Sequence, residues 1–217
     1  MKKTDETNDF LSVESGLFQN ERRIWGLSYE IIAGVDEAGR GPLAGPVVAA
    51  AVALASPIAR FPSVFDSKQI SDARRRRLRD EILAVCGVMV GVAVIDAAKI
   101  DEINILRATH LAMREALAKI AKVRFALIDG LPVPGLPCPS EAIVKGDTKS
   151  ALIAAASIIA KVHRDEIMEG LALKYPLYGF EKHKGYGTAE HINALKKFGP
   201  CPIHRKTFAP VRHCYAL

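Results

Sequence analysis

The sequence predicts an α/β fold in which a mixed β-sheet is flanked by helices and followed by a C-terminal helical extension. Two observations carry this prediction. Apolar runs of strand length, such as VVAAAVAL at residues 47–54, alternate along the chain with longer stretches whose apolar residues recur at helical spacing. The first two strands, at residues 31–36 and 47–54, follow one another directly and could form a hairpin, whereas helices separate the later strands. This order is typical of a sheet covered by helices.

Length and composition limit both the size class and the partners. A chain of 217 residues with 49% hydrophobic residues can bury a full core, so we expect one domain with an appendage. A net charge of +6 and a pI near 9.2 favour a polyanionic partner, because neutralising phosphates is a common reason for excess lysine and arginine. No apolar run has transmembrane length and no apolar signal core follows the first lysines, so we expect a cytoplasmic protein.

The four cysteines show no spacing typical of a disulfide framework, and we expect free thiols. Cys201 and His204, followed by His213 and Cys214, have the residue types of a zinc site. The adjacent pair at 213 and 214 fits poorly into one tetrahedron, so zinc is the less favoured interpretation.

The first half of the chain is expected to form a polar arm, three strands and one helix. The arm comprises residues 1–28, and the strands follow at residues 31–36, 47–54 and 88–95. The second strand is apolar on both faces, which is typical of a central strand. Ser71 is a suitable N-cap for the helix. The helix should bury Leu78, Ile82 and Leu83, and the arginine run at residues 74–77 is interpreted as a solvated face rather than a nucleic-acid patch.

The second half is expected to contain further strands and the longest helices. A single helix is predicted over residues 101–122, followed by a strand at 124–129 and, after a proline-rich connection, a short strand at 142–144. A largely apolar, and therefore buried, helix should run from Thr148 to about Leu173, and a last helix should begin after Thr188. The apolar side of the helix over 101–122 should consist of Ile105, Leu106, Leu111, Met113, Leu117 and Ile120.

Two of the predicted core strands end in acids. The strand IIAGVD is followed by Glu37, so that Asp36 and Glu37 stand together, and the strand RFALID ends on Asp129. An isolated Asp-Glu pair is more often a solvated turn, and Asp147 taken alone is more often a helix cap. The repetition of the pattern, with the glycine-rich turn Gly39-Arg40-Gly41 behind the first pair, favours convergence of these acids on a bound cation. Asp165 lies roughly 27 Å along a straight helix from Asp147, so we expect it to pair with a nearby Arg or Lys instead.

Carboxylates without histidine or cysteine select hard cations, so Mg²⁺ or Mn²⁺ is the expected cofactor. Together with the basic charge of the chain, such a cluster indicates metal-assisted hydrolysis of a phosphodiester. The candidate metal ligands and catalytic residues are Asp36, Glu37, Asp129 and Asp147.

The stretch VDEAGRGPLAGPVVAAAV resembles the signature of ribonuclease HII, the type 2 ribonuclease H family. DSK, LIDG, KGD, HKGYGT and HRKTF follow in the family's order, so the resemblance covers residues 31–211. It implies a ribonuclease H-like sheet with a C-terminal helical extension. It also implies a division into an arm at residues 1–28, a catalytic core at 29–173 and a substrate-binding extension at 174–217.

The resemblance further implies an endonuclease that hydrolyses the RNA strand of RNA/DNA hybrids. It would also nick duplex DNA 5′ to an embedded ribonucleotide, leaving a 3′-hydroxyl and a 5′-phosphate. In the family, the four acids matching Asp36, Glu37, Asp129 and Asp147 form the metal site. The turn Gly39-Arg40-Gly41 and Tyr186 would read the 2′-hydroxyl, with Tyr186 packing on the deoxynucleotide after the ribose.

Several expectations rest on the residues themselves or stay open. Basic residues in polar or glycine-rich segments are candidate phosphate contacts: Lys68, Lys145, Lys184 and Arg205. Leu131 stands where the family commonly has Asn, and Thr207 where it has Ser. A ribonuclease HIII-like enzyme and a non-catalytic nucleic-acid-binding module are the alternatives. We expect a monomer acting on hybrids and ribonucleotide-containing DNA. The sequence does not decide whether a sliding clamp recruits it.

Overall fold

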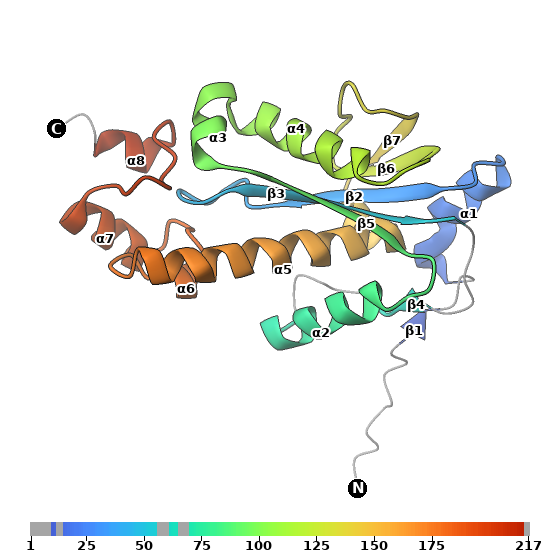
Figure 1. The fold of residues 1–217 in the computed structure, drawn as a ribbon, viewed down its shortest axis with the longest axis horizontal. Helices are drawn as coiled ribbons and strands as arrows, with labels where there is room; N and C mark the ends of the chain where they lie inside the picture. Colours follow the sequence, from blue (N-terminus) through green and yellow to red (C-terminus); the bar gives the residue numbers. More distant parts are fainter. Residues whose placement is uncertain (1–9, 12–14, 56–60, 65–69, 215–217) are drawn as a thin grey trace, which may run out of the picture.

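The computed structural model describes residues 10–11, 15–55, 61–64 and 70–214. Figure 1 shows one sheet between two helical layers, with α3 and α4 on one face and α5 on the other, and the C-terminal helices gathered at one end of α5. None of the helices in the described ranges has the length and apolar character needed to cross a lipid bilayer. The predicted α/β architecture is confirmed.

The central sheet has five strands in the order β5-β3-β2-β6-β7. Strands β2 and β3 form an antiparallel hairpin and β5 pairs antiparallel with β3, whereas β2, β6 and β7 are mutually parallel. Strand β3 lies inside the sheet with every residue buried, as its uniform apolarity predicted. The bounds are β2 Ile32–Ala38, β3 Val47–Leu54, β5 Met89–Ile95, β6 Phe125–Asp129 and β7 Ser140–Ile143. Outside this sheet, β1 (Phe10–Leu11) pairs antiparallel with β4 (Phe61–Pro62).

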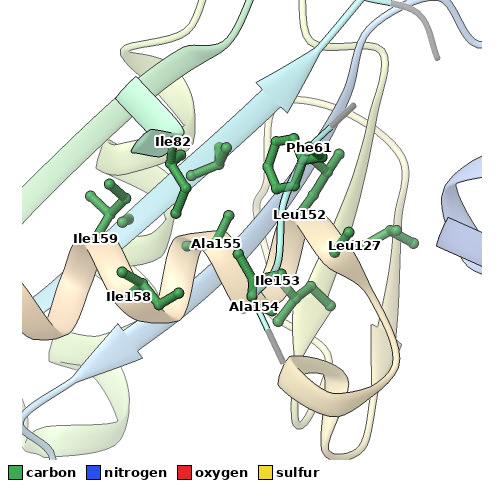
Figure 2. Packing of buried hydrophobic residues seen from close by; sticks show 14 of the residues in the cluster. Phe61, Ile82, Leu127, Leu152, Ile153, Ala154, Ala155, Ile158 and Ile159 are labelled. Atoms are coloured by element: carbon green, nitrogen blue, oxygen red, sulfur yellow. The ribbon is translucent and has the colours of Figure 1, made fainter. Parts of the chain in front are cut away.

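The long helix α5 (Ala151–Lys174) covers one face of the sheet and crosses β2 at Gly34. A Cβ at Gly34 would lie 2.2 Å from the carbonyl carbon of Leu152, so only glycine allows this approach of helix to strand. Figure 2 shows the apolar side chains of α5 packed against Leu127 of β6 and against Phe61 and Ile82. Ile82 belongs to α2 (Asp72–Leu83), which begins after the predicted N-cap Ser71, whose side chain accepts from the Arg74 amide. Leu83, predicted to be buried, is exposed.

The opposite face of the sheet is covered by two helices where the sequence predicted one. Helix α3 (Ala97–Ile103) ends and α4 (Ile105–Ala118) begins at Asn104, which has a positive φ of 66°. The Asn104 side chain accepts from the Arg107 amide and so caps α4. The single helix over 101–122 is therefore wrong, because asparagine tolerates the left-handed region and offers a cap. Leu106, expected on the apolar side, is exposed.

The start of α5 also differs from the prediction. Asp147 lies in a separate 3₁₀ turn, η2 (Gly146–Thr148), and α5 begins only after the N-cap Ser150. Lys145 before the turn is left-handed at φ 56° and Ser150 is extended at φ −140°, so the backbone cannot be helical through residue 150. Helix α5 therefore begins at Ala151, three residues after the start of the helix predicted over 148–173.

Both ends of the described chain add helices to this frame. η1 (Gly16–Phe18) and α1 (Gln19–Gly26) bury Leu17, Phe18 and Ile24 in the same apolar cluster as α5. At the other end, α6 (Phe180–His183) packs beside the C-terminal end of α5, and α7 (Ala189–Phe198) and α8 (Ala209–His213) follow, with Val211 of α8 packed in one cluster with Leu195 of α7 (Figure 1). The predicted cap of α7, Thr188, accepts from the His191 amide. The division of the chain at residues 28 and 173 stays a prediction.

Candidate active site

The two acidic strands lie next to each other in the sheet and run in the same direction. Val35 of β2 is paired with Ile128 of β6, so the next residues, Asp36 and Asp129, are neighbours across the two strands. Asp36 and Glu37 stand inside β2, which continues to Ala38, whereas Asp129 is the last residue of β6, as predicted. This register brings together residues 93 positions apart, as the repeated strand-acid pattern predicted.

Short hydrogen bonds hold the carboxylates of this cluster. The Glu37 amide donates to Asp36 Oδ1 at 2.6 Å, and the Gly146 amide donates to Asp129 Oδ1 at 2.6 Å. Ser157 of α5 also hydrogen-bonds Asp36. Asp147 follows Gly146 directly and is 6% exposed, so the turn that carries it is tied to Asp129. We refer to Asp36, Glu37, Asp129 and Asp147 as the carboxylate cluster.

The cluster concentrates negative charge in a buried place. Burial raises the pKa of Asp36 well above its usual range, and the charges of Glu37 and Asp129 raise it further. Burial also raises the pKa of Glu37, although Arg40, at 3.3 Å from Glu37 Oε1, opposes that rise. A divalent cation would relieve this repulsion and return both acids to their ionised forms.

The donor set fits a hard cation. As the side chains stand, no three His, Cys, Asp or Glu residues in the described ranges are arranged to hold a metal ion. The carboxylate cluster nevertheless offers only oxygen donors, the set that Mg²⁺ and Mn²⁺ prefer.

Behind the cluster, the loop at residues 39–46 is held by two arginines that are fully buried. Arg205 donates from Nε to the Gly45 carbonyl at 3.0 Å, from Nη1 to that of Arg40 at 2.8 Å and from Nη2 to that of Gly39 at 2.6 Å. Arg164 of α5 donates to the carbonyls of Pro46 at 2.9 Å and Ala44 at 3.2 Å. Two guanidinium groups thus bind five carbonyls of this loop.

The position of Arg205 does not fit the predicted phosphate contact. Its side chain is 0% exposed and its donors point into the protein. Burial, and then the charge of Arg164, lowers the pKa of Arg205 to about 9, so the group is still charged at neutral pH. Sequence reasoning selected this arginine but could not show that its guanidinium binds backbone carbonyls of the loop.

Glycine is required where the loop meets Arg164. Gly39 has a φ of +95°, and a Cβ there would lie 2.0 Å from Arg164 Nε. Both the backbone conformation and the packing therefore exclude a side chain. Gly41, by contrast, is exposed, and the ring of Tyr186 is its nearest neighbour, with Cε1 4.0 Å from where a Cβ would stand. Within the predicted Gly-Arg-Gly turn, the backbone at Gly41 is thus open to a ligand beside an aromatic ring.

The turn forms one side of a hollow of about 370 Å³. Glu37 and Tyr186 also line it, together with three polar residues that the sequence analysis did not select, Arg75, Ser157 and Lys161. The run at 74–77 is therefore not only a solvated face, because Arg75 turns toward the site. Ser157, Lys161 and Arg164 recur at helical spacing in an otherwise Ala- and Ile-rich helix. That polar stripe was the available signal.

Tyr186 stands at the edge of this hollow with 43% of its surface exposed. The ring lies within cation–π distance of Lys161 and Arg164, whose charged groups are 5.9 and 5.8 Å from its centroid. Its exposed face and basic neighbours suit stacking on a nucleotide.

The backbone of Tyr186 is held by a chain of buried imidazoles. The Cys201 amide donates to His204 Nδ1 at 2.9 Å, so the proton of His204 is on Nε2. His204 Nε2 then donates to His191 Nε2 at 2.9 Å, and His191 Nδ1 donates to the Tyr186 carbonyl at 2.9 Å. Burial lowers the pKa of His191. Burial, and then the charge of His191, lowers the pKa of His204 to about 4. Both rings are therefore neutral at pH 7.

The remaining predicted residues differ in their surroundings. Lys145 is exposed at the start of η2, next to the carboxylate cluster in sequence. Lys184 Nζ is bound by Glu169 Oε1 at 2.9 Å and by the Glu181 carbonyl at 2.6 Å. Lys68 lies outside the described residues. Leu131 is 70% exposed just beyond Asp129, and Asp165 pairs with Lys161 at 2.7 Å, as expected.

Known proteins similar in sequence point to one family. A family model described as Ribonuclease HII matches residues 33–211. A protein from Chlamydia caviae named Ribonuclease HII is 52% identical over 211 residues, 96% of each chain. Another with this name, from Rhodospirillum rubrum, is 56% identical over 190 residues, 85% of this chain and 87% of its own.

Solved structures give the same result at the level of the fold. Ribonuclease H2 from Pyrococcus horikoshii OT3 has a TM-score of 0.69 and 28% identity, covering 86% of this chain and 97% of its own. The RNase HII of Archaeoglobus fulgidus, solved in a complex with PCNA, has a TM-score of 0.65 and 28% identity, with coverages of 82% and 95%. Bst-RNase HIII in complex with Mn²⁺ has a TM-score of 0.67 at 21% identity, with coverages of 86% and 69%.

Proposed function

The chain belongs to the ribonuclease HII family and is an endoribonuclease that cleaves RNA in RNA/DNA hybrids and at ribonucleotides embedded in DNA, and we propose that its carboxylate cluster is the catalytic site. The single observation that supports this assignment is the parallel register that places Asp36 beside Asp129. Ser157 and the Gly146 amide hold these two acids, and Glu37 and Asp147 complete the set. The reaction gives 3′-hydroxyl and 5′-phosphate ends.

Mg²⁺ or Mn²⁺ is the proposed cofactor, held by the four acids. The Mn²⁺ complex of the related Bst-RNase HIII is consistent with this choice. Such ions activate water for attack on phosphorus and stabilise the leaving 3′-oxygen. Asp36 and Asp129 would provide ligands from rigid strands, and Glu37 would give up its contact with Arg40 to bind the cation. Arg40, 52% exposed, would then be available to the substrate.

Selection of the ribonucleotide is assigned to the opposite side of the hollow. The Gly39-Arg40-Gly41 turn, in which Arg40 and Gly41 are exposed, can present backbone groups to a 2′-hydroxyl, which is both donor and acceptor. Tyr186 would pack on the following deoxynucleotide and so sense the junction between RNA and DNA. Lys145, Arg75 and Lys161 are the proposed phosphate contacts. Lys184 and Lys68 stay weaker candidates, and Arg205 acts instead by holding the turn.

Partners and location follow from the substrate. We propose that the protein works as a monomer in the cytoplasm on hybrids and ribonucleotide-containing duplexes, where its described cysteines, all unbridged, stay reduced. A sliding clamp is a candidate partner, because the archaeal relative was solved with PCNA. Light scattering of the free protein, with and without the clamp of the same organism, tests both statements.

The deciding experiment is cleavage of a DNA duplex that contains one ribonucleotide, with Mg²⁺ and Mn²⁺ supplied separately. Asp129→Asn should abolish turnover while the protein still folds and binds the duplex. Asp96→Asn is the matched control, since Asp96 caps α3 through the Lys99 amide and lies outside the hollow. A metal-dependent nick 5′ to the ribonucleotide is the expected result.

Each other outcome of this experiment revises a particular assignment. Cleavage of long hybrids alone would remove the roles given to the Gly-Arg-Gly turn and Tyr186 and would favour a ribonuclease HIII-like activity. Tight binding without cleavage under either metal would favour a non-catalytic binding module. Full turnover by Asp129→Asn would exclude the carboxylate cluster as the catalytic site.

A further inference from the structure

We propose that helix α1 is a positioning element for the carboxylate cluster and that Glu21 is its principal residue. Glu21 is a fully buried acid on a helix that precedes residue 33, where the matched part of the chain begins. It touches neither the hollow nor the four acids and is therefore a positioning residue. The proposal rests on the assignment of Asp36, Glu37, Asp129 and Asp147 as metal ligands.

Glu21 binds the start of α5 directly. Its Oε1 accepts from the Ser150 hydroxyl at 2.6 Å and from the Leu152 amide at 3.0 Å. Ser150 in turn accepts from the Ile153 amide at 3.1 Å, as the N-cap of α5. Two amides of the first helical turn are thus satisfied by two side chains, and a carboxylate is placed where the helix dipole favours negative charge.

Two neighbours of Glu21 bind the chain on either side of Asp147. Asn20 Nδ2 donates to the Lys149 carbonyl at 2.8 Å, after the turn. Arg23 Nη2 bridges both carboxylate oxygens of Glu141 in β7 at 2.8 and 2.7 Å, before the turn. The residues at 20, 21 and 23 therefore attach one short helix to both strand β7 and the start of α5.

A continuous series of hydrogen bonds leads from Glu21 to the acids. The Ser150 amide donates to the Gly146 carbonyl at 2.9 Å, and the Gly146 amide donates to Asp129 Oδ1 at 2.6 Å. Asp147 lies between these two points of attachment. A shift of Ser150 would consequently move both the residue that orients Asp129 and the backbone of Asp147.

The chemistry of Glu21 favours a positioning role over a purely stabilising one. Its Oε2 is buried, and no described residue hydrogen-bonds it. Burying an acid with one oxygen unsatisfied is costly, so this position is not occupied for stability alone. A fixed acceptor is nevertheless required to bind the Ser150 hydroxyl and the Leu152 amide at once. Residues that orient metal ligands in this way are worth about 10- to 100-fold in metal affinity or activity.

The test compares three variants by Mn²⁺ binding without substrate, measured by calorimetry and by the electron paramagnetic resonance of free Mn²⁺. Glu21→Ala removes the acceptor and should weaken binding about tenfold. Glu21→Gln keeps an acceptor oxygen and should stay within about twofold of the natural protein. Asp96→Ala, which removes the side-chain cap of α3, should lower the melting temperature and leave Mn²⁺ affinity unchanged.

The results separate this inference from the assignment of the catalytic site. Unchanged Mn²⁺ affinity in Glu21→Ala, or an equal loss in Asp96→Ala, would overturn the role of α1. If the natural protein bound no Mn²⁺, or Asp129→Asn bound it unchanged, the catalytic assignment itself would fail. Should Glu21→Ala not fold, Asn20→Ala and Arg23→Ala remove the flanking contacts, and wild-type affinity in both would overturn the proposal equally.

Discussion

The carboxylate cluster and the 39–46 loop are adjacent in the chain but are held in place by different means. Asp36, Glu37 and Asp129 stand on neighbouring parallel strands, so the backbone ladder of the sheet positions them, and Asp147 stands in a turn hydrogen-bonded to Asp129. The loop has no such ladder. Five of its carbonyls are bound by the side chains of Arg164 and Arg205, which are more than 100 residues away.

The difference shows how a selective nuclease can separate metal binding from recognition of the ribose. Metal ligands repel one another and need a support that does not relax, which a sheet interior provides. A loop that meets a ribose must leave its backbone open on one side, so its other side has to be satisfied by buried donors. We therefore expect changes in the cluster to affect turnover and changes in the supports of the loop to affect selectivity and stability.

Among the further variants that compare these two regions, the largest effect is expected from Asp36→Asn. Loss of this ligand should reduce turnover by about 10³-fold, equivalent to about 4 kcal/mol of transition-state stabilisation. Stability should not fall, because a buried acid with two acidic neighbours loses its charge. Single-turnover cleavage and thermal melting with a chelator present measure the two quantities. Lowered stability with intact turnover would reverse the roles assigned to the two regions.

A smaller catalytic effect with a large loss of stability is expected from Arg205→Met. The side chain would no longer bind the carbonyls of Gly39, Arg40 and Gly45, and leaving buried acceptors unpaired costs about 1–3 kcal/mol each. Cleavage at a single ribonucleotide should fall more than Mn²⁺ binding. Arg77→Met, on a side chain that is 68% exposed, is the control, and equal behaviour of both variants would contradict the support role.

Tyr186→Ala tests the open side of the loop. Loss of stacking, worth about 1–3 kcal/mol per base, should weaken cleavage at a single ribonucleotide by about tenfold or more and affect long hybrids less. Tyr186→Phe retains the ring and should behave like the natural protein. The measurement is kcat/KM on both substrates, and an equal loss on both would argue against junction sensing.

The smallest effect is a dependence of stability on pH from His204. Its pKa is about 4 in the folded protein, below the ordinary value of 6.5, so the unfolded chain takes up the proton first. The contribution of up to about 3 kcal/mol is complete above pH 6.5 and is lost as the pH falls toward 4. His191, the Cys201 thiol and Tyr178 are the titratable groups that contact the ring, and the charge of His183 also lowers its pKa.

Thermal melting between pH 7.5 and 4.5 measures this loss. His204→Gln should flatten the profile in the range from 6.5 to 4, whereas His163→Gln, on an exposed side chain of α5, should leave it unchanged. A natural protein with the same melting temperature throughout would mean that the imidazole chain carries no linked proton.

Much of the fold was predictable because it depends on local patterns. The uniformly apolar β3 and the caps Ser71 and Thr188 were predicted at the residues where they occur. The helix over 101–122 was not, since apolar spacing continues through Asn104 and only its left-handed backbone divides α3 from α4. The surroundings of Arg75 and Arg205 were predicted wrongly for a related reason. A sequence shows that a side chain is charged but not whether it points to solvent, to the site or into the protein.

The sequence by itself determined the kinds of element, the acids carried by two core strands and the family to which the chain belongs. These follow from side-chain periodicity and from motifs confined to short segments. Only the tertiary structure decided that Asp36 stands beside Asp129, that Arg164 and Arg205 serve backbone carbonyls, and that Glu21 is attached to the turn of Asp147. Such contacts join residues about 90 to 170 positions apart, and their partners are chosen by packing and by the need to satisfy buried polar groups.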